Sequence, residues 1–129
     1  MKQVKGTCLC GETIMTVTEL GNHITACHCK MCRKQNASAA FFTEEVAAEN
    51  LTFNQEDTIS VYPSSEWAER GFCNRCGTFL FYRYRKEKQA HLNVELFDDW
   101  LKEAHFREQI FYGNKPDYYE FANTTEKHF

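Results

Sequence analysis

The sequence of 129 residues has little proline, no long apolar run and no excess of basic charge. Because no apolar run follows the first lysine, we expect no signal peptide. No stretch approaches the roughly 20 apolar residues that span a bilayer, which argues against a membrane protein. A formal net charge of −3 argues against nucleic acid as the main partner, since phosphate binding usually needs a basic excess. Together these absences predict a cytoplasmic protein.

The chain also lacks the internal repeats, low-complexity runs and linkers that separate domains. Its length is that of one ordinary domain, and apolar residues make up 43% of it, which is enough for a buried core. We therefore expect a single domain over residues 1–129, with its seven cysteines as metal ligands. Thiols in tight clusters in a reducing compartment bind metal more often than they form disulfides.

Strand signals recur about every ten residues along the chain. Segments rich in β-branched and aromatic residues lie at 13–20, 23–29, 38–43, 51–54, 58–63, 78–84 and 91–97. This spacing predicts a mainly β fold with antiparallel neighbours. Helix signals are weak: a turn or two after Cys32, and a short helix capped by Asp98 and Asp99. The polar tail over residues 123–129 is expected to fray.

The cysteines are the main chemical feature, and they fall into three groups: Cys8 and Cys10; Cys27, Cys29 and Cys32; Cys73 and Cys76. Zinc takes four ligands in structural sites. In catalytic sites it commonly takes three and keeps one open position. Seven cysteines therefore divide into four plus three, which predicts one saturated zinc and one zinc that is a ligand short.

The C-x-C spacing has a simple geometric meaning. In extended backbone, residues i and i+2 point to the same face, so Cys8 and Cys10 can reach one ion while Leu9 points away. The same geometry turns His28 away from its two flanking cysteines, which favours a core position for this histidine over a ligand role.

The C-x2-C spacing also suits zinc, because two thiolates can wrap one ion in a tight turn, and Gly77 just after the pair permits the backbone to turn.

Spacing alone does not say which cysteine groups bind the same ion. One alternative is a zinc ribbon that leaves three other cysteines over; its ligands would be Cys29, Cys32, Cys73 and Cys76. We rank it below a scheme that keeps the trio together, because three adjacent ligands close a small loop.

Other candidate residues carry weaker signals. Lys30, Arg33 and Lys34 lie beside the trio, where they either offset the negative charge of a zinc–thiolate centre or form a solvated face. No general base stands out, and His23, His28 and His105 are candidates by residue type only. Trp67, Trp100 and most other aromatic residues are expected in the core, with one or two at the pocket wall.

Three motifs together resemble a known family. "GTCLCGETI" (6–14), "CHCKMCRKQNAS" (27–38) and "ERGFCNRCGTFLF" (69–81) are similar, in this order, to the glutathione-dependent formaldehyde-activating enzymes, a family that includes centromere protein V-type domains. The resemblance implies a coiled, mostly antiparallel β-fold with zinc-binding knuckles, like that of methionine sulfoxide reductase B and the translationally controlled tumour protein.

The resemblance also implies a pairing of the cysteines. A structural zinc would be held by Cys8, Cys10, Cys73 and Cys76. A second, labile zinc at the substrate site would be held by Cys27, Cys29 and Cys32. Family members often carry glycine near Ala37 or Ala39, so a methyl group here is expected to narrow the pocket floor.

The implied activity is that of a carbon–sulfur lyase that handles the adduct of formaldehyde with glutathione or another small thiol. Arg33, Lys34 and Arg70 would hold the carboxylates of the tripeptide. A non-catalytic, zinc-stabilised binding or carrier module is the alternative that the same residues leave open.

Overall fold

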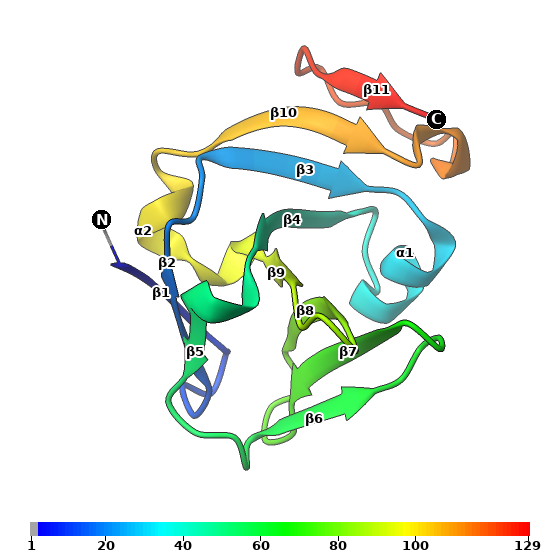
Figure 1. Ribbon diagram of the computed structural model, residues 1–129. Coiled ribbons are helices and arrows are strands. Elements are labelled where there is room, and N and C mark those ends of the chain that lie inside the picture. Colours follow the sequence, from blue (N-terminus) through cyan, green and yellow to red (C-terminus); the bar gives the residue numbers. More distant parts are fainter. Residues whose placement is uncertain (1–2) are drawn as a thin grey trace.

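The protein is built from two β-sheets, which a computed structural model describes for residues 3–129 (Figure 1). In this part of the chain the smaller sheet has the order β1-β2-β5, with bounds Gln3–Thr7, Ile14–Thr18 and Leu51–Phe53. The larger sheet has the order β11-β10-β3-β4-β9-β8-β7-β6. Its strands are β3 (His23–Cys27), β4 (Phe41–Val46), β6 (Ile59–Tyr62), β7 (Ala68–Cys73), β8 (Phe79–Tyr84), β9 (Ala90–Asn93), β10 (His105–Ile110) and β11 (Glu126–His128).

Helices are short and lie on opposite sides of this sheet system. The two α-helices are α1 (Lys30–Asn36) and α2 (Asp98–Leu101), and single 3-10 turns lie at Ala48–Asn50, Val94–Leu96 and Tyr112–Asn114. Figure 1 shows the larger sheet curving from β11 at the top to β6 at the bottom. The smaller sheet and α2 lie on one side of it and α1 on the other. No helix in residues 3–129 is long and apolar enough to cross a membrane.

The predicted mainly β fold is confirmed, and each of the predicted segments contains strand residues. Strands β1, β7, β10 and β11 were not predicted. The sequence of β7, AERGFC, has two charged residues near its start, yet its first four residues are all buried. Glu69 is neutralised there by Arg83, whose Nη2 lies 2.6 Å from Oε2. A strand that buries paired charges does not show the apolar alternation on which sequence prediction relies.

One expectation about strand arrangement holds in part, and another is wrong. Antiparallel pairing holds for most neighbours, but β10 runs parallel to both β3 and β11. The C-terminal tail contains β11, which pairs with β10 in the register Glu108↔Glu126. Ladder hydrogen bonds and an ion pair from His128 to Glu108 at 2.9 Å hold it there, so polarity alone is a poor sign of fraying.

The helices begin earlier than predicted. Helix α1 starts at Lys30 with Cys29 as its N-cap, so Cys32 lies inside the helix and not before it. In α2 the residues Asp98 and Asp99 occupy the first turn, and they do not cap the helix, because Phe97 is the N-cap residue and makes no side-chain cap bond. Acidic residues still suit this first turn electrostatically.

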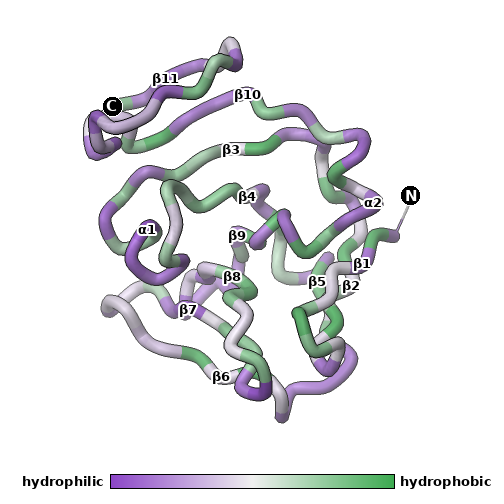
Figure 2. Tube along the Cα trace, turned by 180° about the vertical axis from the view of Figure 1, so that it is seen from behind, coloured by the Kyte–Doolittle hydropathy of each residue, from purple (hydrophilic) through white to green (hydrophobic). Residues whose placement is uncertain are grey.

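Two hydrophobic clusters form the core. The main one contains Cys8, Cys73, Phe81 and Phe97 among its buried members. The second is small and consists of Cys27, Cys32, Phe41 and Phe79. Figure 2 shows apolar stretches along the central strands and a mostly hydrophilic α1. The cysteine groups therefore belong to different parts of the core.

The two tryptophans differ. Trp100 is buried, as expected, whereas Trp67 is 65% exposed, so the predicted core position of Trp67 is wrong.

Gly71 on β7 leaves space for the ring of Phe81, because a Cβ at this position would lie 2.2 Å from that ring.

Candidate metal centres and the adjoining cavity

The first cysteine pair lies in a turn and not in an extended strand. Strand β1 ends at Thr7, and the Gly11 amide donates to the Cys8 carbonyl at 3.1 Å to close the turn. The two sulfurs are nevertheless 3.6 Å apart, and Leu9 points to solvent as expected. The geometric reason given for C-x-C is thus wrong here, although its result is right: a turn brings the two thiols together.

The C-x2-C pair forms a second turn at the end of β7. The Gly77 amide donates to the Cys73 carbonyl at 2.8 Å, and Gly77 has a φ of +82°, a value that glycine adopts without strain. The predicted role of this glycine is confirmed. Burial raises the pKa of Cys76, but hydrogen bonds with Thr78 and Cys10 together outweigh burial and lower the pKa to about 5.

The two turns face each other across the end of the sheets. Cys10 Sγ lies 3.9 Å from Cys73 Sγ, and all four sulfurs of Cys8, Cys10, Cys73 and Cys76 lie within 4.8 Å of one another. Thiolates 2.3 Å from a tetrahedral zinc are roughly 3.8 Å apart. The cluster therefore has the donor set and the spacing that a four-coordinate metal ion needs.

The cysteine trio is gathered where β3 passes into α1. Cys27 ends the strand, Cys29 caps the helix and Cys32 lies in its first turn. The Cys32 amide donates to Cys29 Sγ at 3.3 Å, and the Cys27 thiol lies 3.5 Å from Cys32 Sγ. Hydrogen bonds from the Cys27 and Cys32 thiols lower the pKa of Cys29 to about 2, so this cluster favours a thiolate. All three sulfurs lie within 4.8 Å of one another.

These distances decide between the pairings left open by spacing. The grouping implied by the family resemblance is the one that the fold assembles, and the alternative zinc ribbon is wrong because its four cysteines belong to two separate clusters. All seven cysteines are free thiols, without disulfides. That these clusters hold zinc stays a prediction.

Arg70 supplies the positive charge beside the trio. Its guanidinium is buried, with Nη1 and Nη2 donating to Cys32 Sγ at 3.6 and 3.7 Å. Its Nε donates to Ser64 Oγ, and its Cζ lies 4.8 Å from the ring centroid of Tyr82. A buried cation needs a compensating negative charge. The thiolate of the trio supplies this charge: hydrogen bonds from Cys27 and Cys32 lower the pKa of Cys29, and the Arg70 guanidinium adds to this lowering.

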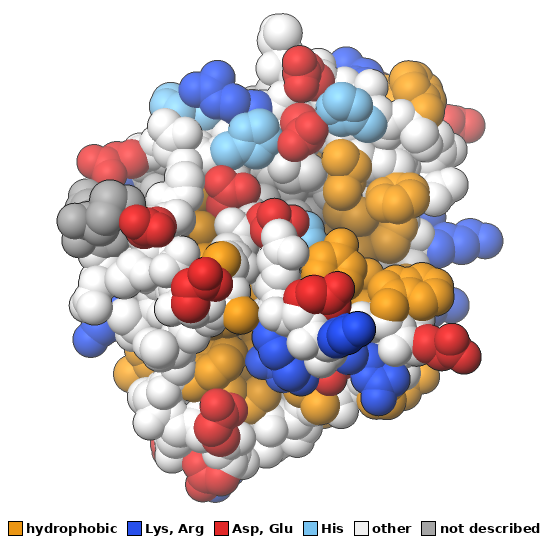
Figure 3. All heavy atoms as spheres, in the orientation of Figure 1, with side chains coloured by type: hydrophobic (Ala, Val, Ile, Leu, Met, Phe, Trp, Pro, Cys, Tyr) orange, Lys and Arg blue, Asp and Glu red, His pale blue; other side chains and the backbone are white. Residues whose placement is uncertain are grey.

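A cavity of about 300 Å³ opens beside the trio. Aromatic and apolar side chains make up most of its wall, with a few polar groups. Its lining residues are Cys27, Cys29, Met31, Cys32, Phe41, Thr43, Ser64, Ser65, Trp67, Arg70, Tyr82, Tyr84, His91, Ile110 and Phe111. Pockets of this size with a few convergent polar groups are typical of small-molecule sites. Figure 3 shows hydrophobic side chains gathered on the same side of the molecule as α1.

Of the three predicted cationic ligand-binding residues, Arg70 alone lines this cavity. Arg33 donates from Nε to the His28 carbonyl at 3.1 Å and from Nη2 to the Asn114 carbonyl. Together with Lys34, it borders a separate shallow hollow. The same hollow contains Ala37 and Ala39, so their methyl groups narrow this second hollow and not the cysteine cavity.

The histidine candidates are placed elsewhere. His28 is fully buried, bonded to Gln109 at 2.8 Å and to the Tyr119 hydroxyl at 3.1 Å, so its predicted core position is confirmed. His91 lines the cavity instead, and sequence reasoning missed it. One hint in the sequence was the place of His91 in the predicted strand 91–97. Its neighbours in the cavity wall, Tyr82 and Tyr84, come close to it only when β8 pairs with β9.

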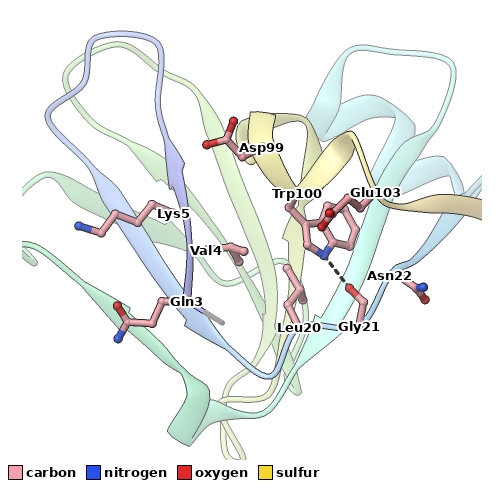
Figure 4. A pocket seen from close by; sticks show the side chains of 9 residues that line it. All are labelled: Gln3, Val4, Lys5, Leu20, Gly21, Asn22, Asp99, Trp100 and Glu103. Atoms are coloured by element: carbon pink, nitrogen blue, oxygen red, sulfur yellow. Dashed lines mark hydrogen bonds between the residues drawn. The ribbon is translucent and has the colours of Figure 1, made fainter. Parts of the chain in front are cut away.

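Two further features lie away from the cysteines. Figure 4 shows a larger open hollow of about 670 Å³ between β1 and α2, where the Trp100 indole donates to the Gly21 carbonyl at 2.6 Å. Figure 3 shows histidine and acidic side chains along the upper edge of the molecule. There Glu108, Glu126 and His128 come together on exposed or half-buried positions of β10 and β11. Neither feature contains a cysteine.

Comparison with known proteins places the chain. The model of the family described as glutathione-dependent formaldehyde-activating enzyme matches residues 3–114. The chain belongs to this family. An uncharacterized lyase of Schizosaccharomyces pombe is 31% identical over 126 residues, which cover 97% of this chain and 90% of the relative. The crystal structure of a Rhodobacter sphaeroides protein superposes with a TM-score of 0.61 at 23% identity, covering 73% of this chain and 87% of that one, a likeness that shows the fold alone.

Proposed function

We propose that this member of the family is a zinc-dependent carbon–sulfur lyase that binds a small thiol, such as glutathione, at the three-cysteine site and forms or cleaves its adduct with formaldehyde. The observation that carries the proposal is the cavity of about 300 Å³ on which three thiols and a buried arginine converge. The lyase name of the yeast relative and the family membership point to the same chemistry.

The two cysteine clusters would have different tasks. Cys8, Cys10, Cys73 and Cys76 would hold a structural zinc, because four thiolates saturate the ion. Cys27, Cys29 and Cys32 would hold a second zinc and leave its fourth position facing the cavity. When bound there, zinc would act as a Lewis acid that favours the thiolate form of a coordinated thiol.

The chain's own residues then prepare the site for a thiolate. Arg70 donates two hydrogen bonds to Cys32 Sγ and offsets the negative charge that accumulates on clustered sulfurs. The inner aromatic wall, which includes the buried Phe41 and the half-buried Tyr82, excludes water on one side, and a drier site strengthens each electrostatic contact within it. Ser64 orients Arg70 by accepting from its Nε at 3.2 Å.

The ligand's carboxylates would be held by cationic side chains. Arg70 is inside the cavity, whereas Arg33 and Lys34 border the neighbouring hollow. We therefore assign Arg70 to the sulfur end of the ligand. Arg33 and Lys34 would serve only a group that extends out of the cavity. The proposal further holds that residues 1–129 form one domain, with a fold like that of methionine sulfoxide reductase B, in a cytoplasmic protein that does not bind nucleic acid.

The test is a glutathione titration of zinc-loaded protein, followed by nuclear magnetic resonance exchange measurements on a mixture of glutathione and formaldehyde. Binding together with faster exchange between free formaldehyde and S-hydroxymethylglutathione is the expected result. Binding without acceleration would identify a carrier module instead. Absence of both would contradict the proposal. Cys29→Ser, which removes one sulfur of the trio, is the matched control.

A further inference from the structure

One polar group in the cavity wall has no hydrogen-bond partner within residues 3–129. Thr43 is 3% exposed, and its Oγ1 makes no hydrogen bond among the described residues. A buried hydroxyl without a hydrogen bond costs free energy, and nearly all buried polar groups avoid this. Thr43 lines the cysteine cavity, and a rotation about its χ1 that turns the hydroxyl into the cavity would let a ligand supply the missing partner.

Thr43 is displaced from the cysteines along β4. On β4 it follows Phe41 by two residues, and both side chains line the cavity. Phe41 stands opposite Cys27 in the β3–β4 register. Because a strand rises about 3.3 Å per residue, Thr43 is displaced by roughly 7 Å along the strand from the cysteine row. A thiol adduct held by its sulfur thus has room to extend toward this hydroxyl.

His91 stands on the same side of the sheet as Thr43. It faces Glu45 across the β4–β9 pair, and its Nε2 lies 3.3 Å from Glu45 Oε2. Thr43 and Glu45 share one face of β4, which makes His91 the diagonal neighbour of Thr43. A hydrogen on Nε2 would face the Glu45 carboxylate, and this tautomer leaves Nδ1 as an acceptor.

We propose that Thr43 and His91 form a subsite that binds the hydroxyl oxygen of the thiol–formaldehyde adduct, with His91 Nδ1 as the proton acceptor and the Thr43 hydroxyl as a donor to that oxygen. This inference rests on the proposed function and adds to it the catalytic base that sequence reasoning did not find.

The chemistry balances without an oxidant or a reductant. The hydroxyl proton of the adduct passes to His91 Nδ1, and the electrons of the broken O–H bond form the carbonyl of formaldehyde. The C–S bond breaks with its electron pair moving to sulfur, and His91 then returns the proton to the thiolate or to water. In the reverse direction the same groups join thiol and formaldehyde. The carbonyl oxygen keeps its hydrogen bond from Thr43 throughout.

The first experiment uses zinc-loaded protein and compares Thr43→Val, which has nearly the same shape, with Thr43→Ser, which keeps the hydroxyl. We expect Thr43→Val to bind glutathione as the wild type does and to bind S-hydroxymethylglutathione about five- to tenfold more weakly, the effect of one lost neutral hydrogen bond. Thr43→Ser should bind both as the wild type does. The melting temperature of Thr43→Val should not fall, because an unpaired hydroxyl has been removed.

The second experiment is the pH profile of adduct exchange for the wild type and His91→Gln. Burial lowers the pKa of His91 below its ordinary value, and the charge of Glu45 on β4 offsets only part of this lowering. Tyr82 and Tyr84 on β8 are the other titratable groups that face the ring. The protein-dependent rate should rise with pH through this pKa, since only the neutral ring accepts a proton. His91→Gln should lose this step and about a hundredfold in rate while still binding the adduct.

The outcomes separate the two proposals. Wild-type affinity and rate in both Thr43→Val and His91→Gln would overturn the subsite and leave the proposed function intact. A wild type that neither binds glutathione nor accelerates exchange would overturn both. If Thr43→Val does not fold, the pH profile of His91→Gln decides alone, and an unchanged profile would overturn the inference.

Discussion

The two cysteine clusters use the same side chain in different surroundings, and the difference separates stability from chemistry. Cys8 and Cys73 belong to the main core, whereas Cys27 and Cys32 pack in a small core beside a cavity. The first cluster joins cysteines 63 positions apart, as between Cys10 and Cys73, and the second joins cysteines only five apart. Because loop-closure entropy grows with loop length, a metal in the first cluster stabilises the fold more than one in the second.

The largest expected effect comes from breaking the four-cysteine cluster. Cys73→Ser should prevent folding or lower the melting temperature drastically, because the free energy of binding a structural zinc is on the order of 10 kcal/mol and is coupled to folding. Soluble yield and thermal unfolding by circular dichroism measure it. Cys27→Ser is the matched control, since Cys27 is also a buried thiol at the end of a strand. Equal melting temperatures for the two variants would remove the distinction.

A second substitution sharpens the comparison from the other side. Cys29→Ser should remove one metal ion per chain and abolish glutathione binding, yet shift the melting temperature by only about 4 °C, the equivalent of about 1 kcal/mol. Serine is a favoured N-cap residue, so α1 keeps its cap. Metal analysis and calorimetric titration check this. Aggregation of Cys29→Ser alongside normal behaviour of Cys10→Ser would reverse the assignment of the clusters.

Arg70 tests whether the environment of the trio matters as much as its ligands. Arg70→Met should weaken metal retention at the three-cysteine site about 10- to 100-fold, as loss of partners that hydrogen-bond to metal ligands commonly does, and leave the other site unchanged. Arg70→Lys should be intermediate, because it keeps the charge but not the two parallel contacts to Cys32. Competition with a chelator of known affinity measures both. Identical retention in all three proteins would contradict a role for Arg70.

The smallest effect is expected at the cavity mouth. Trp67→Ala should change the free energy of unfolding by no more than about 0.5 kcal/mol, because the side chain is largely exposed, and should weaken glutathione binding a few-fold. Tyr62→Ala is the control, since Tyr62 is similarly exposed and lines neither this cavity nor the hollow beside Arg33 and Lys34. Equal affinities of the two variants would show that Trp67 takes no part in binding.

Sequence reasoning predicted the parts of this molecule that depend on local spacing. The strand over residues 13–20 alternates clearly and forms β2, and Gly77 follows its cysteine pair for the backbone reason given. The family motifs predicted which cysteines come together. Each of these signals lies within a few neighbouring residues, where one sequence carries the whole pattern.

The missing parts depend on contacts between distant segments. Strand β7 was missed because it contains two charged residues, Glu69 and Arg70. Both are buried because partners elsewhere in the chain, Arg83 and Cys32, contact them. Trp67 looked like a core residue, and its exposure follows from its place at the mouth of a cavity that no single segment forms. His91 joins the site because β4, β8 and β9 pair, which spacing along the chain does not reveal.

The central claim is that one metal ion is saturated by protein sulfur while a second is one ligand short and reachable from the cavity. The most direct test is metal analysis of purified protein before and after brief exposure to a mild chelator, with circular dichroism recorded in parallel. The account predicts two zinc ions per chain, of which one is lost while the fold persists and is regained when zinc is added. A single ion at the outset, or two ions lost together with the fold, would contradict it.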